Sequence, residues 1–302
     1  MLQLFGRRSR ADLPSIVFND DGKQRVLFTL PPTRRPDRPS ALVFAMPKSG
    51  STLLDRIMRR LSRHVGLRYV SVMGTFFKLG VPDKDMPAET SRIFLPHGYC
   101  YGGFRYLPGF DIPILGAARS VLLVRDPRDM LVSHYYSMRE SHVEPGRSLK
   151  STSLTLPQRE TARSVDIDDY VKGPVAEHFR TCLTRYRTML CASYDVKLYR
   201  YEDVIYDKAN WVADLANHFG WEIPRWRTDS IARRFDIIPR HEETAEHIRQ
   251  VHPGNYRKKL APETVAWLNG FLREEMEYFG YATNEATGSD GAMPRQGRRD
   301  LG

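Results

Sequence analysis

The middle of the chain alternates short apolar runs with longer segments in which apolar residues recur at helical spacing. Residues 41–46 (ALVFAM) and 120–124 (SVLLV) are uninterrupted apolar runs, which is typical of strands buried on both faces of a parallel sheet. After the first run, apolar residues recur three or four positions apart from 53 to 65, with arginines between them. This pattern predicts a buried strand that is followed directly by an amphipathic helix.

The same alternation continues toward the C-terminus. Residues 175–191 place apolar side chains on one helical face, and residues 196–201 (VKLYRY) are typical of another strand. Residues 210–220 and 263–280 are further amphipathic segments, and each ends in a glycine. Strands that alternate with helices predict an α/β fold, which we expect to be a P-loop-like three-layer fold with a central, mainly parallel sheet flanked by helices.

We expect one folded domain over residues 41–283. Residues 1–40 mix charges with prolines, which predicts an irregular N-terminal lead-in. Residues 284–302 are small, polar and glycine-rich, which predicts a disordered tail. Residues 140–166 form a long polar stretch, and its length indicates either a mobile lid or an insertion.

Composition limits the class of protein without choosing a function. Lys and Arg outnumber Asp and Glu by 46 to 36, an excess that fits either simple solubility or an anionic ligand. No basic patch interleaved with aromatic residues indicates nucleic acid. The 3 cysteines lack the spacing of a zinc site or a disulfide framework. No apolar run approaches the roughly 18 residues of a membrane span, so we expect a cytoplasmic protein in a reducing compartment.

Residues 47–52 (PKSGST) lie where the first predicted strand meets the first predicted helix. Backbone N–H groups at a helix N-terminus, exposed by a glycine, bind phosphate or sulfate well. The alternative is an ordinary turn in which a Ser or Thr caps the helix. The spacing G-x-x-x-x-G-K-[ST] of nucleoside triphosphatases is absent, so we expect an anion held without a metal ion. The candidate anion-binding residues of this loop are Lys48, Ser49, Gly50, Ser51 and Thr52.

A second candidate anion site follows the second apolar run. Arg125 ends that run, and Ser133 lies in the predicted helix that follows, which Asp126 is suited to cap. Both side chains could face the carboxyl edge of a parallel sheet, where ligands bind in such folds. A guanidinium and a hydroxyl suit a second phosphate group. The alternative for Arg125 is an ion pair at the strand end.

Three segments, PKSGSTLL, VRDPRDMLVSHYY and YRYEDV, occur in this order and resemble the cytosolic-type sulfotransferase family. The resemblance spans about residues 41 to 281. It implies transfer of a sulfuryl group from 3′-phosphoadenosine 5′-phosphosulfate (PAPS) to an acceptor hydroxyl or amine, without a metal. It also implies a loop that cradles the 5′-phosphosulfate, with Lys48 at the bridging oxygen and the transferring group.

The resemblance assigns the remaining donor contacts as well. Arg125 and Ser133 would hold the 3′-phosphate, and Tyr201 would lie near the adenine. HIRQVHPGNYRKKL is similar to a late basic element of the family and offers Arg249 and Arg257 at matching positions. Many members have a tryptophan after the anion loop, whereas this chain has Leu53, so the adenine pocket is expected to be partly rebuilt.

Sulfuryl transfer also needs a base for the acceptor proton, and histidine suits this role because its pKa lies near working pH. His97 follows the strand-like run SRIFLP in a register similar to that of the family's catalytic histidine. The prediction is therefore that His97 is the base, with His134, His247 and His252 as weaker candidates.

Two other functions stay open on the sequence alone. One is a magnesium-dependent P-loop small-molecule kinase, and the other is a non-catalytic nucleotide-binding protein of the same fold. The acceptor is also open, since residues 99–110 (YCYGGFRYLPGF) could line an acceptor site or simply pack. Subunit pairing is common in the family, so the resemblance raises a homodimer as an expectation that no motif decides.

Overall fold

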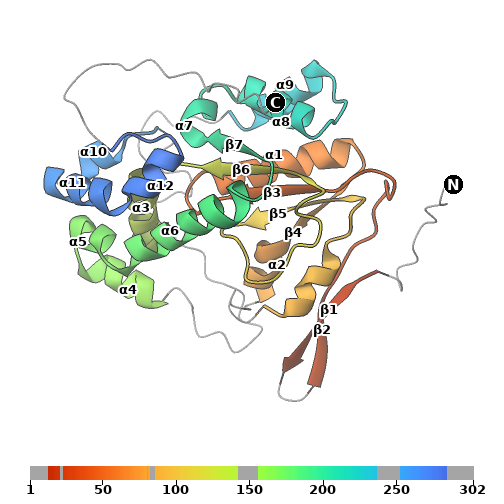
Figure 1. Ribbon diagram of the computed structural model, residues 1–302, viewed down its shortest axis with the longest axis horizontal. Helices are drawn as coiled ribbons and strands as arrows, with labels where there is room; N and C mark the ends of the chain where they lie inside the picture. The colour runs from red at the N-terminus through yellow and green to blue at the C-terminus, as the bar shows by residue number, and fades with distance from the viewer. Residues whose placement is uncertain are drawn as a thin grey trace, which may run out of the picture.

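A computed structural model describes residues 13–20, 23–79, 81, 86–141, 156–236 and 252–283. Its centre is a five-stranded sheet with the strand order β4-β5-β3-β6-β7, and every pairing in it is parallel. This confirms the predicted α/β fold with a central parallel sheet flanked by helices (Figure 1). The five strands are β3 (Ala41–Ala45), β4 (Arg68–Ser71), β5 (Tyr99–Phe104), β6 (Arg119–Val124) and β7 (Val196–Arg200).

The two faces of the sheet are covered by different helices. Along β3, Leu42 and Phe44 belong to one hydrophobic cluster, whereas Ala41, Val43 and Ala45 belong to another, as the two-residue period of a strand requires. The first cluster includes α2 (Val72–Leu79) and α6 (Pro174–Arg185), and the second includes α1 (Ser51–His64), α8 (Lys208–His218) and α9 (Arg225–Arg234). Because both faces are buried, the strands read as continuous apolar runs.

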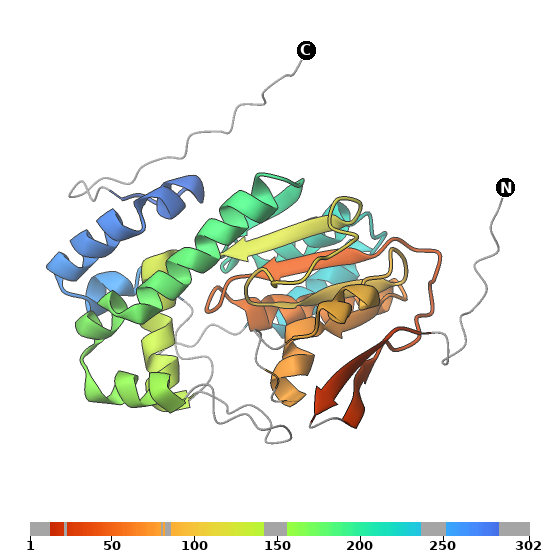
Figure 2. The same ribbon diagram turned by 60° about the horizontal axis from the view of Figure 1, so that its bottom comes forward.

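A group of helices lies beyond the carboxyl ends of β3 and β6, toward which the strand arrows point in Figure 2. These helices bury their apolar faces on the end of the sheet and so enclose the edge at which the predicted anion loop lies. The elements are α3 (Pro127–Tyr136), α4 (Leu156–Ser164), α5 (Ile167–Lys172), α10 (Tyr256–Lys259), α11 (Pro262–Phe271) and α12 (Arg273–Tyr278).

The N-terminal segment differs from the prediction of an irregular lead-in. Residues Ser15–Asp20 (β1) and Lys23–Thr29 (β2) form an antiparallel pair that projects from the body in Figure 1. Ile16 and Leu30 are fully buried in the first hydrophobic cluster. The folded unit therefore extends to the N-terminal side of residue 41.

Three helical segments also differ from the predictions. The run SRIFLP (residues 91–96) was expected to be strand-like, but its first three residues belong to a 3₁₀ helix, η3 (Ala88–Ile93). The predicted helix over 263–280 divides at Leu272, which separates α11 from α12. Within the predicted lid, α4 is helical, while residues 142–155 lie outside the described residues, as does the predicted tail. The remaining short elements are the π-helical turns η4 (Ser137–Ser141) and η5 (Tyr186–Cys191) and the helix α7 (Tyr201–Val204).

Candidate active site

The loop between β3 and α1 has the geometry of an anion site. Gly50 caps α1 with φ 87°, and no side chain caps the helix or places an acid in its first turn. The first N–H groups of a helix have no partner within the helix, so here they stay available to a ligand. Lys48 has a positive φ of 62°, which is uncommon for a residue with a side chain. Ser51 is buried and Thr52 half-buried at the start of α1.

Ser49 has a different role from the predicted one. Its hydroxyl donates to the carbonyl oxygens of Met46 at 2.7 Å and Leu123 at 3.1 Å, and its backbone N–H donates to Met46 at 3.3 Å. Both donors are therefore used inside the protein, and the side chain is fully buried. Ser49 fastens the loop to β6, and its side chain is not available for the anion that the sequence assigned to it.

Arg125 joins the two predicted anion sites into one. Its Nη2 lies 3.3 Å from Asp129 Oδ2, and its Nη1 lies 3.5 Å from the backbone carbonyl oxygen of Lys48. The guanidinium stacks over the Tyr201 ring at 4.6 Å from the centroid. Its Nε is buried and has no hydrogen-bond partner. Arg125 therefore forms the ion pair that the sequence left as an alternative. Its Nε nevertheless remains as a donor for an oxyanion.

Asp129 connects Arg125 to the late basic segment. Its Oδ2 also accepts the backbone N–H of Gly254 at 2.7 Å, and its Oδ1 accepts that of Tyr256 at 3.0 Å. The carboxylate is fully enclosed. Arg257 follows Tyr256 and lies over its ring, with 4.8 Å between the guanidinium carbon and the ring centroid. The structure therefore brings Arg257 to the neighbourhood of Arg125, whereas Arg249 lies outside the described residues.

The other predicted donor contacts gather around the same arginine. Ser133 is half-buried in α3 and lies four residues after Asp129, so the two share a helix face. Tyr201 lies between Arg125 and Gly50, since a Cβ atom built on Gly50 would stand 2.9 Å from Tyr201 Cδ2. Leu53 packs against the hydrophobic cluster on the α1 face of the sheet.

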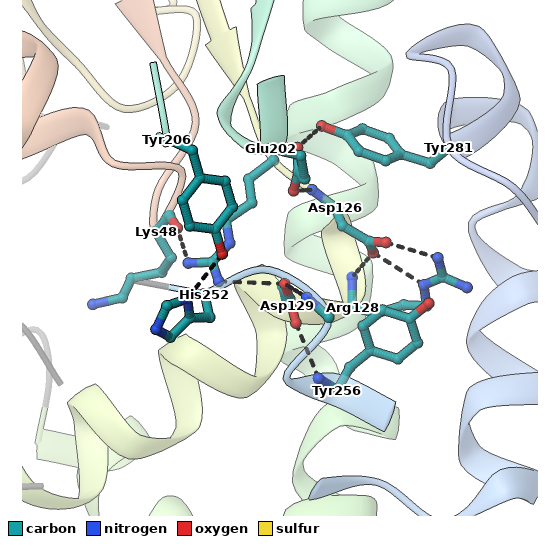
Figure 3. A network of polar contacts seen from close by, with 11 residues as sticks. Lys48, Asp126, Arg128, Asp129, Glu202, Tyr206, His252, Tyr256 and Tyr281 are labelled. Carbon is teal, nitrogen blue, oxygen red and sulfur yellow. Dashed lines mark hydrogen bonds and ion pairs between the residues drawn. The ribbon is translucent and has the colours of Figure 1, made fainter. Parts of the chain in front are cut away.

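A buried polar network fixes the start of α3 beside this site. Asp126 caps α3, as predicted, by accepting the backbone N–H of Arg128 at 2.9 Å, and it also accepts two side-chain bonds from Arg128 at 2.7 and 3.0 Å. The backbone N–H of Asp126 donates to Glu202 Oε1 at 2.9 Å, and the Tyr281 hydroxyl donates to Glu202 Oε2 at 2.9 Å (Figure 3). Burial raises the pKa of Glu202 above its ordinary value. The network ties strands β6 and β7 to the C-terminal helices.

His97 does not lie in this site. It precedes β5 and bridges to Pro39, which precedes β3, whereas the anion loop follows the other end of β3. The five residues of β3 span roughly 16 Å, so the sheet itself separates His97 from Lys48. The prediction of a catalytic His97 conflicts with this register. The sequence suggested a strand ending at the histidine, but in the fold the strand begins after it.

Two other histidines have structural surroundings that the sequence did not reveal. His134 is buried, and its Nδ1 lies 2.9 Å from the Tyr170 hydroxyl, so it packs inside the helical group. His252 is exposed, and its Nδ1 lies 2.8 Å from the Tyr206 hydroxyl. His252 is two residues before Gly254, whose backbone N–H donates to Asp129, and Asp129 in turn pairs with Arg125. His247 is outside the described residues.

The family model of the sulfotransferase domain matches residues 114–280. The chain belongs to the sulfotransferase family. The matched residues hold β6, Arg125, α3 and the late basic segment, so the second candidate anion site of this sulfotransferase lies within the match and the Lys48 loop precedes it. No curated protein sequence matches the chain.

The solved structure of a retinol dehydratase supports the same fold for this sulfotransferase. Retinol dehydratase in a complex with retinol and PAP has a TM-score of 0.51 and 14% sequence identity, covering 80% of this chain and 82% of that one. Mouse sulfotransferase SULT7A1 complexed with PAP has a TM-score of 0.48 and 14% identity, covering 79% of this chain and 85% of that one. At 14% identity, the likeness to retinol dehydratase concerns the fold alone.

Two features are absent from the described ranges between residues 13 and 283. Among these residues, no group of three or more His, Cys, Asp or Glu side chains has an arrangement that could hold a metal ion. None of the helices in the same ranges combines the length and apolar character needed to cross a membrane.

Proposed function

We propose that this sulfotransferase takes PAPS as its donor and transfers the sulfuryl group to a hydroxyl or amine of an acceptor molecule. The observation that carries the proposal is the contact between Arg125 and the Lys48 carbonyl, because it joins two anion-binding elements at one edge of the sheet. A donor with phosphate groups at both ends of an adenosine needs two such elements close together. Family membership and the PAP bound to the similar retinol dehydratase support this choice of donor.

Each end of the donor has a matching set of groups in this proposal. The N–H groups at the start of α1, with Gly50, Ser51 and Thr52, hold the 5′-phosphosulfate, and Lys48 neutralises the leaving phosphate. The buried Nε of Arg125, which has no partner, donates to the 3′-phosphate together with the Ser133 hydroxyl and Arg257. Tyr201 lies against Arg125 and packs beside the adenosine.

The proposed reaction is an in-line displacement at sulfur. The acceptor oxygen or nitrogen forms a bond to sulfur while the bond from sulfur to the phosphate oxygen breaks, which leaves 3′,5′-adenosine bisphosphate. By analogy with phosphoryl transfer, positioning and charge stabilisation by Lys48 and the α1 N–H groups supply most of the rate. The acceptor proton leaves to a base, and we do not assign that role to His97, because the sheet separates it from Lys48.

The test is a pair of measurements on the purified protein. Thermal unfolding with 3′,5′-adenosine bisphosphate should raise the Tm, and 5′-AMP should raise it much less, because only the bisphosphate engages Arg125. Transfer of radiolabelled sulfate from PAPS to a mixed panel of alcohols, phenols and amines should then give a labelled product. Equal effects of the bisphosphate and 5′-AMP would contradict the assignment of the second anion site.

The other two functions left open by the sequence give different results. A magnesium-dependent kinase would be stabilised by ATP with Mg²⁺ more than by the bisphosphate. A non-catalytic nucleotide-binding protein would be stabilised by the bisphosphate and transfer no sulfate to any acceptor in the panel.

A further inference from the structure

The carboxyl end of β5 lies next to the anion loop and carries an arginine that the donor site does not use. In the sheet, Phe104 at the end of β5 pairs with Phe44 of β3, and β3 ends one residue later. Arg105 directly follows Phe104, and its Nη2 lies 2.8 Å from Asp55 Oδ2 on α1. Arg105 therefore lies at the same sheet edge as Lys48, one strand over.

Asp55 holds this strand end in place through three donors. Its Oδ1 accepts the Tyr69 hydroxyl at 2.7 Å and the backbone N–H of Gly103 at 3.1 Å, and its Oδ2 accepts Arg105. Gly103 has φ 77°, and a Cβ built there would stand 2.3 Å from Ser71 Oγ. The positive φ and this close approach both favour glycine at position 103. The backbone before Arg105 is therefore fixed, and so is the direction in which its side chain leaves the strand.

Two polar atoms at this strand end are enclosed and have no hydrogen-bond partner. One is Nη1 of Arg105, and the other is the hydroxyl of Tyr186, a residue that is fully buried. The Tyr186 ring lies 6.2 Å from the Phe44 ring, which stacks on Phe104 at 4.9 Å. Arg185, the residue before Tyr186, donates to the Pro108 carbonyl oxygen at 3.1 Å, so the end of α6 packs on the segment that follows Arg105.

Arg105 Nη1 and the Tyr186 hydroxyl both carry a hydrogen that they can donate. Burial raises the pKa of the Tyr186 hydroxyl well above its ordinary value, while the Arg105 charge acts in the opposite direction, so the hydroxyl keeps its proton at neutral pH. The Arg105 guanidinium bonds Asp55 through Nη2 alone. An enclosed donor without a partner is unfavourable, and such groups in native proteins call for a ligand or an ordered water as their missing acceptor.

The same arrangement occurs at the donor site. Arg125 is held by one aspartate, Asp129, through Nη2, and keeps a buried Nε without a partner. Arg105 is held by one aspartate, Asp55, through Nη2, and keeps a buried Nη1 without a partner. In both cases a carboxylate fixes the planar guanidinium and leaves N–H groups for an oxygen ligand.

We propose that Arg105 and Tyr186 form an acceptor-recognition site for a carboxylate group, which the acceptor carries in addition to the hydroxyl or amine that receives the sulfuryl group. This inference rests on the proposed function, since it assumes that the acceptor binds beside the Lys48 loop. The planar guanidinium matches the two oxygens of a carboxylate, and the Tyr186 hydroxyl adds a neutral donor.

The decisive variants are Tyr186→Phe and Arg105→Gln. Tyr186→Phe removes only a hydroxyl without a partner, so we expect unfolding to be unchanged or shifted to slightly higher temperature. Tyr99→Phe is the matched control, because the Tyr99 hydroxyl already donates to the Pro31 carbonyl oxygen at 3.0 Å. That variant should unfold more easily and keep its choice of acceptor.

The experiment compares acceptors in matched pairs, each as a carboxylate and as the uncharged carboxamide, for example 4-hydroxyphenylacetate and 4-hydroxyphenylacetamide within a panel of such pairs. Sulfate transfer from labelled PAPS and thermal shifts in the presence of 3′,5′-adenosine bisphosphate are both measured. For at least one pair, wild-type protein should favour the carboxylate at least tenfold in kcat/KM. Arg105→Gln should reduce that preference to about onefold, and Tyr186→Phe should reduce it several-fold.

The outcomes separate the two proposals. Bisphosphate binding and sulfate transfer without any preference for a carboxylate would overturn the acceptor site and leave the proposed function intact. A preference that survives in Arg105→Gln would overturn it too, as would a panel in which no carboxylate binds or reacts, since an enclosed water would then be the missing partner. Absence of bisphosphate binding in the wild type would instead contradict the proposed function.

Discussion

Asp129 and Tyr256 are 127 positions apart in the sequence, and the backbone N–H of Tyr256 donates to Asp129 Oδ1 at 3.0 Å. The same carboxylate pairs with Arg125. One buried side chain thus sets both the guanidinium at the end of β6 and the loop that begins the C-terminal helices. Because this buried carboxylate accepts hydrogen bonds from several groups, its removal is expected to lower both the stability of the fold and the affinity for the ligand.

Replacing Asp129 by Ala should reduce the free energy of unfolding by roughly 3–5 kcal/mol, because it leaves the buried Arg125 without its counter-ion. Urea unfolding measures this loss, and amide hydrogen exchange at residues 254–256 should become faster. Asp169→Ala is the control, since that side chain is exposed and its pair with Lys172 is 3.9 Å long. A loss in the control as large as that in Asp129→Ala would contradict the assignment.

Replacing Arg125 by Ala should weaken 3′,5′-adenosine bisphosphate binding about 10- to 100-fold, because hydrogen bonds to charged groups contribute roughly 1.5–3 kcal/mol. Arg125→Lys should bind with intermediate affinity, since a lysine keeps the charge and loses the planar fork. Titration calorimetry gives the Kd. Arg119→Ala, at the amino end of the same strand, should bind as the wild type does. Unchanged binding in Arg125→Ala would show that another group holds the 3′-phosphate.

Replacing His97 by Ala should leave turnover within about twofold of wild type, because the residue lies at the amino end of β5. A general base contributes about 10² to 10⁴ in rate, so the measurement of kcat at saturating substrates has ample range. A drop of a hundredfold with intact bisphosphate binding would restore His97 as the base. His252→Ala should be measured in the same assay, since His252 lies on the loop that is hydrogen-bonded to Asp129.

Replacing Gly50 by Ala should distort the anion loop. The residue has φ 87°, and the new Cβ would stand 2.9 Å from a Tyr201 ring carbon. Such a backbone conformation costs a residue with a side chain of order 1–3 kcal/mol, and bisphosphate binding should weaken at the same time. Gly270→Ala, with no atom within 4 Å of its added Cβ, should instead stabilise α11 by about 0.5–1 kcal/mol. Chemical denaturation compares the two variants.

The raised pKa of Glu202 makes a prediction about pH. Burial is its main cause, so in the folded protein the carboxyl keeps its proton to a higher pH than in the unfolded chain. The contribution to stability is complete below the unfolded pKa of about 4.3 and is lost as pH rises through the folded pKa. Glu202→Gln should flatten this part of the stability profile, measured by urea unfolding between pH 4 and 7. A profile identical to wild type would contradict the prediction.

The sequence predicted β3, β6 and β7, and the turn between β3 and α1, because these features depend on local patterns. ALVFAM is a strand since it is buried on both faces, and PKSGST is a turn because Gly50 needs a positive φ. The cap at Asp126 was also readable, since N-cap, Pro and acid follow one another. These features are decided within a few residues.

Features that depend on distant parts of the chain were not readable in this way. Ser49 looked like an anion ligand, and only the contact with Leu123 reveals that its hydroxyl is used internally. His97 was assigned from its neighbours in sequence, but the strand register decides which edge of the sheet it occupies. The role of Asp129 depends on the contact between residues 254–256 and α3, which no local sequence pattern predicts.

The parallel ladder between β3 and β6 has a consequence for how mutations can act at a distance. Ala45 pairs with Leu123, so the two chains leave the ladder almost level, and Lys48 and Arg125 emerge from it side by side. A slip of one step would displace one end of the donor cradle by roughly 3.3 Å relative to the other. The register of this ladder therefore sets the distance between Lys48 and Arg125. A substitution inside either strand that shifts the register would change the length of the ligand that fits between them.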